Sequence, residues 1–132
     1  MFSHTSEVKV RYGETDQMGF VYHGNYPQYL EIARIDWLES LGICYKDMEQ
    51  KGIMLPVVVL NINYCKPAFY HDILMIKTSL VKLPKASIEF NYKIHNSEGE
   101  MITTAYSKLV FMDSKTRLPI RCPQKFLDKL QN

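Results

Sequence analysis

The sequence predicts an α+β fold in which an antiparallel sheet of about five strands packs against one long helix. A helical apolar period runs through residues 26–41, and strand patterns occur on both sides of it. The strands after the helix are joined by short turns, which favours antiparallel pairing. A sheet and a helix each have an apolar face to bury, so two packed layers are the natural arrangement.

The long helix is the most regular element of the pattern. Its apolar positions are Tyr26, Tyr29, Leu30, Ala33, Trp37 and Leu41. Asn25 is a favourable N-cap, and Gln28 three residues later completes a capping-box pattern. Gly42 is the expected stop. We therefore expect a helix that begins near Asn25 and ends at Gly42.

The strands are predicted from alternation and from β-branched residues. In residues 7–12, Val8, Val10 and Tyr12 form the apolar face. After the helix, strands are expected over residues 54–64, 73–83, 86–94 and 101–112. Alternation in the third of these places five residues inward: Ala86, Ile88, Phe90, Tyr92 and Ile94. A hairpin turn is expected at residues 96–99, and a short C-terminal helix over 123–130.

Length and composition are those of one globular domain, expected to span residues 1–132. Hydrophobic residues make up 46% and charged residues 23% of the chain, which is usual for a soluble protein. The net charge of +2 is too small to indicate a nucleic-acid partner. No apolar run is long enough to span a bilayer, and no signal peptide is visible.

The three cysteines, Cys44, Cys65 and Cys122, are far apart in the sequence. An odd number at wide spacing favours free thiols in a reducing cytoplasm. Neither the cysteines nor the four histidines have metal-ligand spacing. We therefore expect a cytoplasmic protein without a metal site.

Residues 11–25 contain the candidate chemistry. This loop has two glycines, Gly13 and Gly19, and two acids, Glu14 and Asp16, and it leads into the long helix. The first N–H groups of a helix have no internal partner, and the helix dipole adds positive charge there. Such an end attracts a carboxylate, a phosphate or a developing oxyanion. Asp16 is the candidate reactive acid, whereas Glu14 is expected to be a solvated loop charge.

A longer pattern surrounds Asp16. Its residues are Arg11, Tyr12, Thr15, Asp16, Gly19, Val21, Tyr22, His23, Asn25, Tyr26, Glu31, Ala33, Arg34, Leu41 and Gly42, followed later by Tyr64, Lys66, Pro67, Ala68, Asp72, Phe111, Asp113 and Pro119. This pattern resembles that of the 4-hydroxybenzoyl-CoA thioesterase-like hotdog family, and is most similar to its bacterial acyl-CoA thioesterase branch. Gln17, Met18 and His71 depart from the pattern, which leaves loop shape and substrate fit open.

The resemblance implies a hotdog fold, with the sheet wrapped around the central helix. It also implies a homodimer with one continuous sheet, or a dimer of dimers, with the acyl thioester at the subunit interface. Asp16 would be the catalytic nucleophile or general base. The thioester carbonyl would accept hydrogen bonds from the backbone N–H groups of His23 and Gly24. Whether the His23 ring also takes part in catalysis is left open.

Further residues are expected to bind substrate. They are Tyr22, Gly24 and Asn25 at the helix start, Val58, Val59 and Leu60 from the partner subunit's strand, and Lys66, Lys82, Lys85 and Arg121 for the CoA phosphates. Taken alone, Tyr22 also fits a core role, and each lysine also fits an ordinary surface role.

The predicted function is hydrolysis of an acyl-CoA thioester to a free carboxylic acid and CoA. A thiolate leaves easily, so one carboxylate is sufficient without a metal, a cofactor or a serine triad. The alternatives are an acyl-carrier-protein thioesterase and a non-hydrolytic acyl-CoA-binding hotdog protein. A hotdog dehydratase would need an Asp/His pair, and the pattern around Asp16 argues against it. Aryl and aliphatic acyl groups both remain open.

Overall fold

The computed structural model describes residues 2–131, so the first and last residues of the predicted domain lie outside it. The elements in chain order are β1 (Ser3–Lys9), the 3-10 turns η1 (Tyr12–Glu14) and η2 (His23–Asn25), α1 (Tyr26–Ser40), α2 (Tyr45–Gln50), β2 (Ile53–Met54), β3 (Val57–Tyr64), β4 (Ile73–Leu80), β5 (Ser87–His95), β6 (Met101–Val110), β7 (Met112–Asp113) and α3 (Gln124–Gln131). No helix within residues 2–131 has the length and apolar character needed to cross a membrane.

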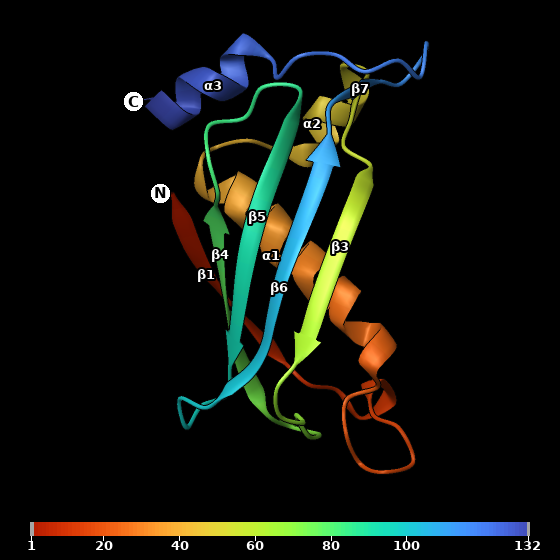
Figure 1. Cartoon of the computed structure of the whole chain (residues 1–132), viewed down its shortest axis with the longest axis vertical. Helices are drawn as coiled ribbons and strands as arrows, with labels where there is room; N and C mark the ends of the chain where they lie inside the picture. Colours follow the sequence, from red (N-terminus) through yellow and green to blue (C-terminus); the bar gives the residue numbers. More distant parts are fainter. Residues whose placement is uncertain (1, 132) are drawn as a thin grey trace.

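The main sheet has five strands in the order β1-β4-β5-β6-β3, and every neighbouring pair is antiparallel. The short strands β2 and β7 form a separate pair. Helix α1 runs along one face of the main sheet, and α3 lies across one end (Figure 1). The predicted α+β hotdog architecture, with its five-stranded sheet, one long helix and short C-terminal helix, is confirmed.

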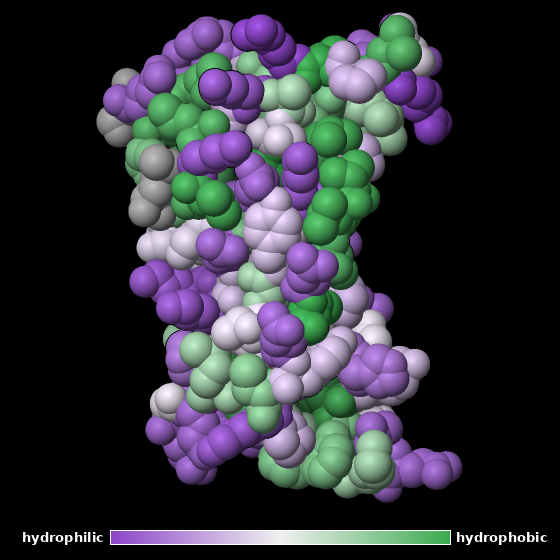
Figure 2. Space-filling view, viewed as in Figure 1, coloured by the Kyte–Doolittle hydropathy of each residue, from purple (hydrophilic) through white to green (hydrophobic). Residues whose placement is uncertain are grey.

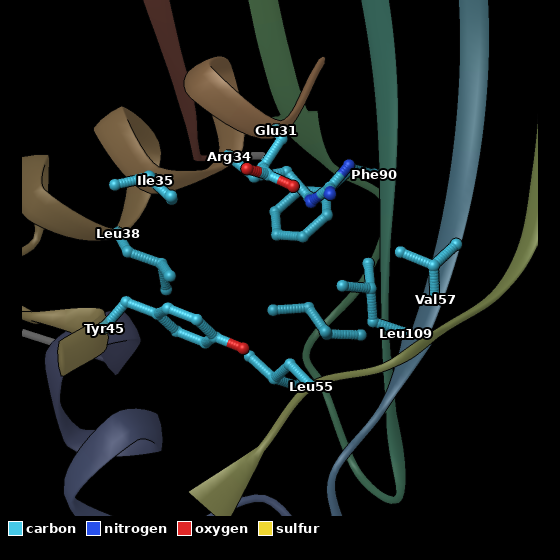
Figure 3. Close-up of a pocket in the computed structure, with 10 residues that line it drawn as sticks. Glu31, Arg34, Ile35, Leu38, Tyr45, Leu55, Val57, Phe90 and Leu109 are labelled. Atoms are coloured by element: carbon cyan, nitrogen blue, oxygen red, sulfur yellow. The ribbon is translucent and has the colours of Figure 1, made fainter. Parts of the chain in front are cut away.

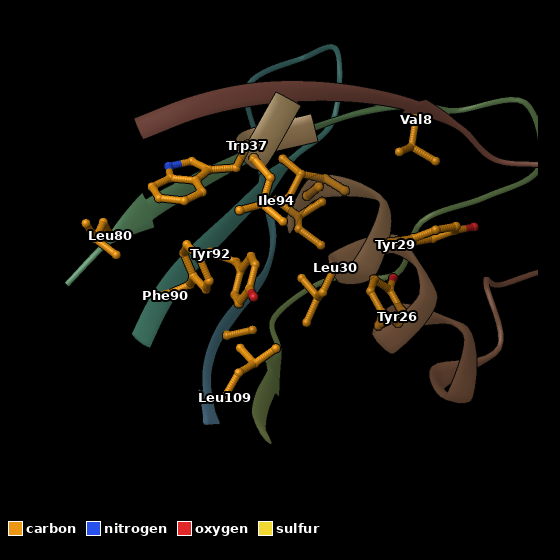
Figure 4. Close-up of a cluster of buried hydrophobic side chains, with 14 of the residues drawn as sticks. Val8, Tyr26, Tyr29, Leu30, Trp37, Leu80, Phe90, Tyr92, Ile94 and Leu109 are labelled. Carbon is orange, nitrogen blue, oxygen red and sulfur yellow. The ribbon is translucent and has the colours of Figure 1, made fainter. Parts of the chain in front are cut away.

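The core lies between α1 and the sheet. Leu30 and Ala33 are fully buried on the sheet-facing side of α1, and Trp37 is 1% exposed. The Trp37 ring packs edge-on against Phe90, with ring centroids 4.9 Å apart. Its Nε1 donates to the carbonyl of Phe2 at 3.1 Å. Figure 4 shows these helix side chains meeting those of β5, so the predicted apolar face of α1 is confirmed.

The start of α1 differs from the predicted capping box. Asn25 has a helical backbone, and its side chain makes no capping bond. Its Nδ2 instead donates to the carbonyl of Glu14 at 2.8 Å. The chain enters α1 through the turn η2, which replaces a side-chain cap. At the other end, Gly42 has φ +78°, as expected of a glycine that ends a helix.

The strand predictions are wrong at their ends. The strand predicted over residues 54–64 is divided by Leu55 and Pro56 into β2 and β3, because proline has no N–H to donate to a sheet, and the strand predicted over residues 73–83 ends at Leu80. β1 stops at Lys9, and Tyr12 is 76% exposed in the turn η1, because Val10 already bonds to Asp72 outside the β1–β4 ladder. Ala86 is exposed because it still belongs to the turn before β5. The strand predicted over residues 101–112 divides at Phe111, which is buried against Phe126, so the following residues pair with β2 instead.

The two edges of the sheet differ in character. The β1 edge consists of the polar sequence SHTSEVK. The β3 edge exposes four apolar residues in succession, Val57–Leu60, each between 37% and 53% exposed. Figure 2 shows hydrophobic side chains gathered along this β3 edge. An apolar free edge is a surface that proteins usually cover.

Candidate functional site

Asp16 lies in a tight loop that holds its carboxylate in place. Its backbone N–H donates to the carbonyl of Phe20 at 2.7 Å. Its Oδ1 accepts from the backbone N–H of Met18 at 2.8 Å and of Phe20 at 3.3 Å. Gly19, with φ +83°, allows the chain to return towards Asp16. Oδ2 makes no hydrogen bond with any residue in the described part of the chain, so it is available to a ligand.

Glu14 fastens this loop to α1, which corrects the prediction of a solvated loop charge. Its side chain is 13% exposed. Oε1 accepts from the backbone N–H of Arg11 at 2.8 Å and from the hydroxyl of Tyr29 at 2.9 Å. Oε2 accepts from the Arg11 guanidinium at 3.0 Å. Burial raises the pKa of Glu14, but these donors outweigh burial and lower it below the ordinary value.

The backbone of Glu14 organises the start of the helix as well. Its carbonyl accepts from the N–H of Tyr22 at 2.9 Å and from the Asn25 side chain at 2.8 Å. The N–H of Asn25 in turn donates to the carbonyl of Tyr22. The N–H groups of His23 and Gly24, which lie between these bonded positions, have no partner within residues 2–131. They are therefore two adjacent free donors at the positive end of α1.

Tyr64 and Tyr22 keep this turn in shape. The Tyr64 hydroxyl donates to the carbonyl of His23 at 3.0 Å. The Tyr22 ring lies against Gly24 so closely that a Cβ on Gly24 would be 2.5 Å from Cε2 of Tyr22. A side chain at Gly24 would therefore push the Tyr22 ring aside. The resemblance assigned Gly24 to substrate binding; its small size also has this local packing reason.

A cavity of 280 Å³ joins the acid to the helix start. Its lining residues are Asp16, Met18, Phe20, Val21, His23, Tyr26, Tyr64, Cys65, Lys66 and Pro67. The structure thus brings Asp16 and His23 to one cavity, together with Lys66. The Lys66 ammonium is 2.6 Å from the Glu100 carboxylate, so a CoA phosphate would compete with Glu100 for it. Tyr22 and Asn25 instead line another cavity, of 630 Å³, which Asp16 also lines.

The remaining predicted binding residues lie elsewhere. Val58, Val59 and Leu60 are exposed on the edge strand β3. Lys82 and Lys85 belong to the turn between β4 and β5, at the opposite end of the sheet from the Asp16 loop (Figure 1). Lys82 is paired there with Glu89 at 3.4 Å. A single subunit therefore does not bring these residues to Asp16.

A second cavity, of 240 Å³, opens between the middle of α1 and the start of β3. It is lined by Glu31, Arg34, Ile35, Leu38, Tyr45, Leu55, Val57, Ile88, Phe90 and Leu109. Figure 3 shows the charged ends of Glu31 and Arg34 on the α1 side, opposite Val57 and Leu109. The walls are otherwise mostly apolar.

Sequence reasoning missed the roles of Glu14 and Tyr64. Tyr64 belongs to the residue pattern quoted above, but no role was assigned to it. The bond from Tyr29 to Glu14 joins residues 15 apart in the chain, so local periodicity does not indicate it. The distances between candidate donors and acceptors become visible only in the folded chain.

Replacing Glu14 by glutamine tests how the loop is fastened. The substitution keeps the shape but removes the charge that strengthens four hydrogen bonds, so we expect a loss of about 1–3 kcal/mol in unfolding free energy near pH 7. A carboxylate with a lowered pKa stabilises the fold above its unfolded-state pKa of 4.5 and loses this effect as the pH falls through the folded value. The difference from wild type, measured by urea unfolding, should therefore shrink as the pH falls below 4.5.

The matched control is Glu98→Gln, because Glu98 is exposed in the hairpin turn between β5 and β6. We expect this control to change the unfolding free energy by less than about 0.5 kcal/mol. A Glu14→Gln protein as stable as the control near neutral pH would show that Glu14 does not fasten the loop.

Known proteins resemble this chain over nearly its whole length. The YneP protein of Bacillus subtilis, provisionally described as an acyl-CoA thioesterase, is 38% identical over 122 residues, 92% of this chain and 88% of YneP. The solved structure of a DHNA-CoA thioesterase from Staphylococcus aureus is 40% identical with a TM-score of 0.93, covering 99% of this chain and 88% of that one. The chloroplastic acyl-acyl carrier protein thioesterase ATL3 of Arabidopsis thaliana is 31% identical over 129 residues, 96% of this chain and 66% of ATL3.

The family comparison agrees with these relatives. A family model described as the thioesterase-like superfamily matches residues 10–130, which include the Asp16 loop, α1 and the whole of β3. The resemblance predicted from the residues around Asp16 is therefore confirmed. The chain belongs to the thioesterase-like superfamily and has its hotdog fold.

Proposed function

We propose that the chain hydrolyses acyl-CoA thioesters with Asp16 as the catalytic carboxylate and the start of α1 as the oxyanion site. The observation that supports this most is that Asp16, with its free Oδ2, lines the same cavity as His23, where the backbone N–H groups of His23 and Gly24 have no partner within the described residues. The activity itself, acyl-CoA thioester hydrolysis, agrees with the prediction from sequence and with the relatives.

The two donors stabilise charge on the thioester oxygen. As a nucleophile adds to the carbonyl carbon, negative charge develops on that oxygen. The N–H groups of His23 and Gly24 would donate to it, assisted by the dipole of α1. Tyr64 holds the carbonyl of His23 at 3.0 Å, so the turn is already in shape before substrate binds. This supports a backbone role for His23 and requires nothing of its ring.

Asp16 either attacks the thioester carbonyl carbon itself or activates a water that attacks it. Oδ1 is held by two backbone donors, and Oδ2 faces the ligand. Direct attack gives a mixed anhydride, expels the CoA thiolate, and is completed by water; alternatively, Oδ2 takes a proton from a water that attacks the carbonyl carbon. In both routes the thiolate leaves without a strong acid to protonate it. Both remain open for this chain.

A second copy of the chain completes the site. The β3 edge is apolar, continuous and free within the described residues, whereas the β1 edge is polar. Antiparallel pairing of two β3 strands about a two-fold axis would cover both apolar edges and extend the sheet across the dimer. With the axis near the middle of β3, this pairing would bring Val57, at the start of the partner subunit's strand, close to Tyr64, at the end of the other strand.

This pairing places two cavities side by side. Tyr64 lines the Asp16 cavity, and Val57 lines the 240 Å³ cavity. The acyl group bound at Asp16 would therefore extend into the second cavity of the partner subunit.

The free thiols Cys44, Cys65 and Cys122 further support a reducing, cytoplasmic location for this dimer.

An acyl-carrier-protein thioester is the second candidate substrate. This candidate is supported by the 31% identity with ATL3, which is described as an acyl-acyl carrier protein thioesterase. The two substrates share the phosphopantetheine arm and the thioester. They therefore share the Asp16 chemistry and differ in what lies outside the cavity. Comparing the same acyl group on CoA and on a carrier protein would distinguish them by kcat/KM.

Replacing Asp16 by asparagine tests the proposed function. The substitution keeps the size and removes the charge, so we expect kcat to fall roughly 100- to 10,000-fold. The measurement is thiol release from short, long and aromatic acyl-CoAs. Asp128→Asn is the control, because Asp128 is exposed on α3, and it should retain wild-type rates. Equal rates for wild type and Asp16→Asn, with both proteins folded, would remove Asp16 from the mechanism.

Replacing Leu60 by glutamate tests the proposed dimer. Two carboxylates would lie side by side near the two-fold axis and repel each other. We expect sedimentation velocity to show a shift from a dimer or larger assembly to the 15.5 kDa monomer, with loss of thioesterase activity. Thr5→Glu on the β1 edge should change neither. A Leu60→Glu protein that keeps the wild-type mass would contradict pairing through β3.

A further inference from the structure

The 240 Å³ cavity contains a guanidinium, that of Arg34, that forms no direct ion pair within the described residues. Arg34 lies on α1 and is half-buried, and no ion pair joins it to a carboxylate within residues 2–131. Its guanidinium lies beside Phe90 in an otherwise mostly apolar cavity (Figure 3). Partial removal of a charge from water costs free energy unless another group replaces the lost hydration. This cavity is therefore suited to a ligand that brings a hydrogen-bond acceptor.

Hydrogen bonds to buried side chains hold the Arg34 guanidinium in place. Its Nη1 donates to the Tyr92 hydroxyl at 3.2 Å, and that hydroxyl lies 2.6 Å from the Ser107 hydroxyl. Tyr92 and Ser107 are both buried, so the anchor does not move freely. The other guanidinium donors make no hydrogen bond within the described residues. Arg34 thus has a fixed position and spare donors.

Arg34 and Asp16 of the same subunit lie at different places along α1. Arg34 is eight residues beyond Tyr26, about 12 Å along the helix axis. In the β3-paired dimer, however, the cavity of the partner subunit opens beside Tyr64, which lines the Asp16 cavity. The far end of a compact acyl group would therefore point at Arg34 of the partner subunit.

We infer that Arg34 determines acyl specificity by donating to an oxygen at the far end of the acyl group, which is bound at Asp16 of the other subunit. This inference rests on the proposed function and names its substrate class, a compact acyl group with a distal oxygen. The volume of 240 Å³ is enough for a compact acyl group.

Glu31 affects whether a neutral or an anionic acyl group binds better. It is the other charged group lining the cavity. With one guanidinium and one carboxylate, the cavity has no net charge to offer a second carboxylate. A neutral hydroxyl can accept from Arg34, whereas an anionic acyl group would be repelled by Glu31. The expected order of preference is therefore hydroxyl, then unsubstituted, then carboxylate.

The test measures binding separately from catalysis. In the Asp16→Asn protein, calorimetry gives Kd for benzoyl-CoA, hydroxybenzoyl-CoA and carboxybenzoyl-CoA without turnover. Adding Arg34→Met keeps the aliphatic length and removes the donors. We expect it to weaken hydroxybenzoyl-CoA binding by about 10- to 100-fold and benzoyl-CoA binding by less than about threefold. Arg34→Lys should restore part of the difference, because it keeps a charged donor.

Stability is controlled with Ile94→Val, which removes one buried methyl group from the core at a residue that does not line the cavity. It should lower Tm and leave the ratio of the two Kd values near that of wild type. Equal weakening of all three ligands by Arg34→Met, or no weakening of any, would overturn the inference. So would tighter binding of benzoyl-CoA than of hydroxybenzoyl-CoA before Arg34 is changed. Failure of the proposed function would appear differently, as thiol release that persists in Asp16→Asn.

Discussion

One helix is too narrow to cover a five-stranded sheet, and most features of this molecule follow from that mismatch. With its side chains, a helix is about 10–12 Å wide, whereas five strands extend over about 19 Å. Helix α1 covers the core, and the β3 edge of the sheet remains uncovered. Leu60 faces the helix side of the sheet, opposite buried Ser107, and is still 37% exposed. The uncovered strip explains both the apolar edge and the cavity beside α1.

The site occurs where the loop from β1 meets the same helix. Glu14 acts through two different groups: its carboxylate is bonded to Tyr29 on α1, and its carbonyl is bonded to Tyr22 and Asn25. These bonds occupy the donors on either side of His23 and Gly24 and leave those two free. The proposed anion site therefore consists of the two N–H groups that the turn leaves unbonded, and it requires no side chain of its own.

The sequence predicted what depends on periodicity and on short-range pattern. The face of α1 around Trp37, the stop at Gly42 and the alternation of Ile88, Phe90, Tyr92 and Ile94 all agree with the structure. Asp16 and His23, the predicted catalytic residues, line one cavity, and their catalytic role stays a prediction. Each of these features is determined within a few residues of the chain.

Features that depend on distant partners could not be predicted in this way. Asn25 appeared to be a side-chain cap because the pattern cannot show that Glu14 offers it a better acceptor. Tyr12 appeared to continue a strand because the bond between Val10 and Asp72 spans 62 residues. Arg34 was part of the family pattern, but its lack of a direct ion pair within the described residues is visible only when its surroundings are known. His71, which departs from the family pattern, adopts φ +75°, a backbone conformation that favours glycine.

The most direct test of this account mixes two inactive proteins. One has Asp16→Asn and an intact 240 Å³ cavity; the other has an intact Asp16 and Leu55→Trp, which fills that cavity. If Asp16 of one subunit acts with the cavity of the other, random pairing gives half mixed dimers, each with one complete site. Thioesterase activity should then return to roughly a quarter of wild type. A mixture no more active than the sum of its two components would show that each subunit's site is complete by itself.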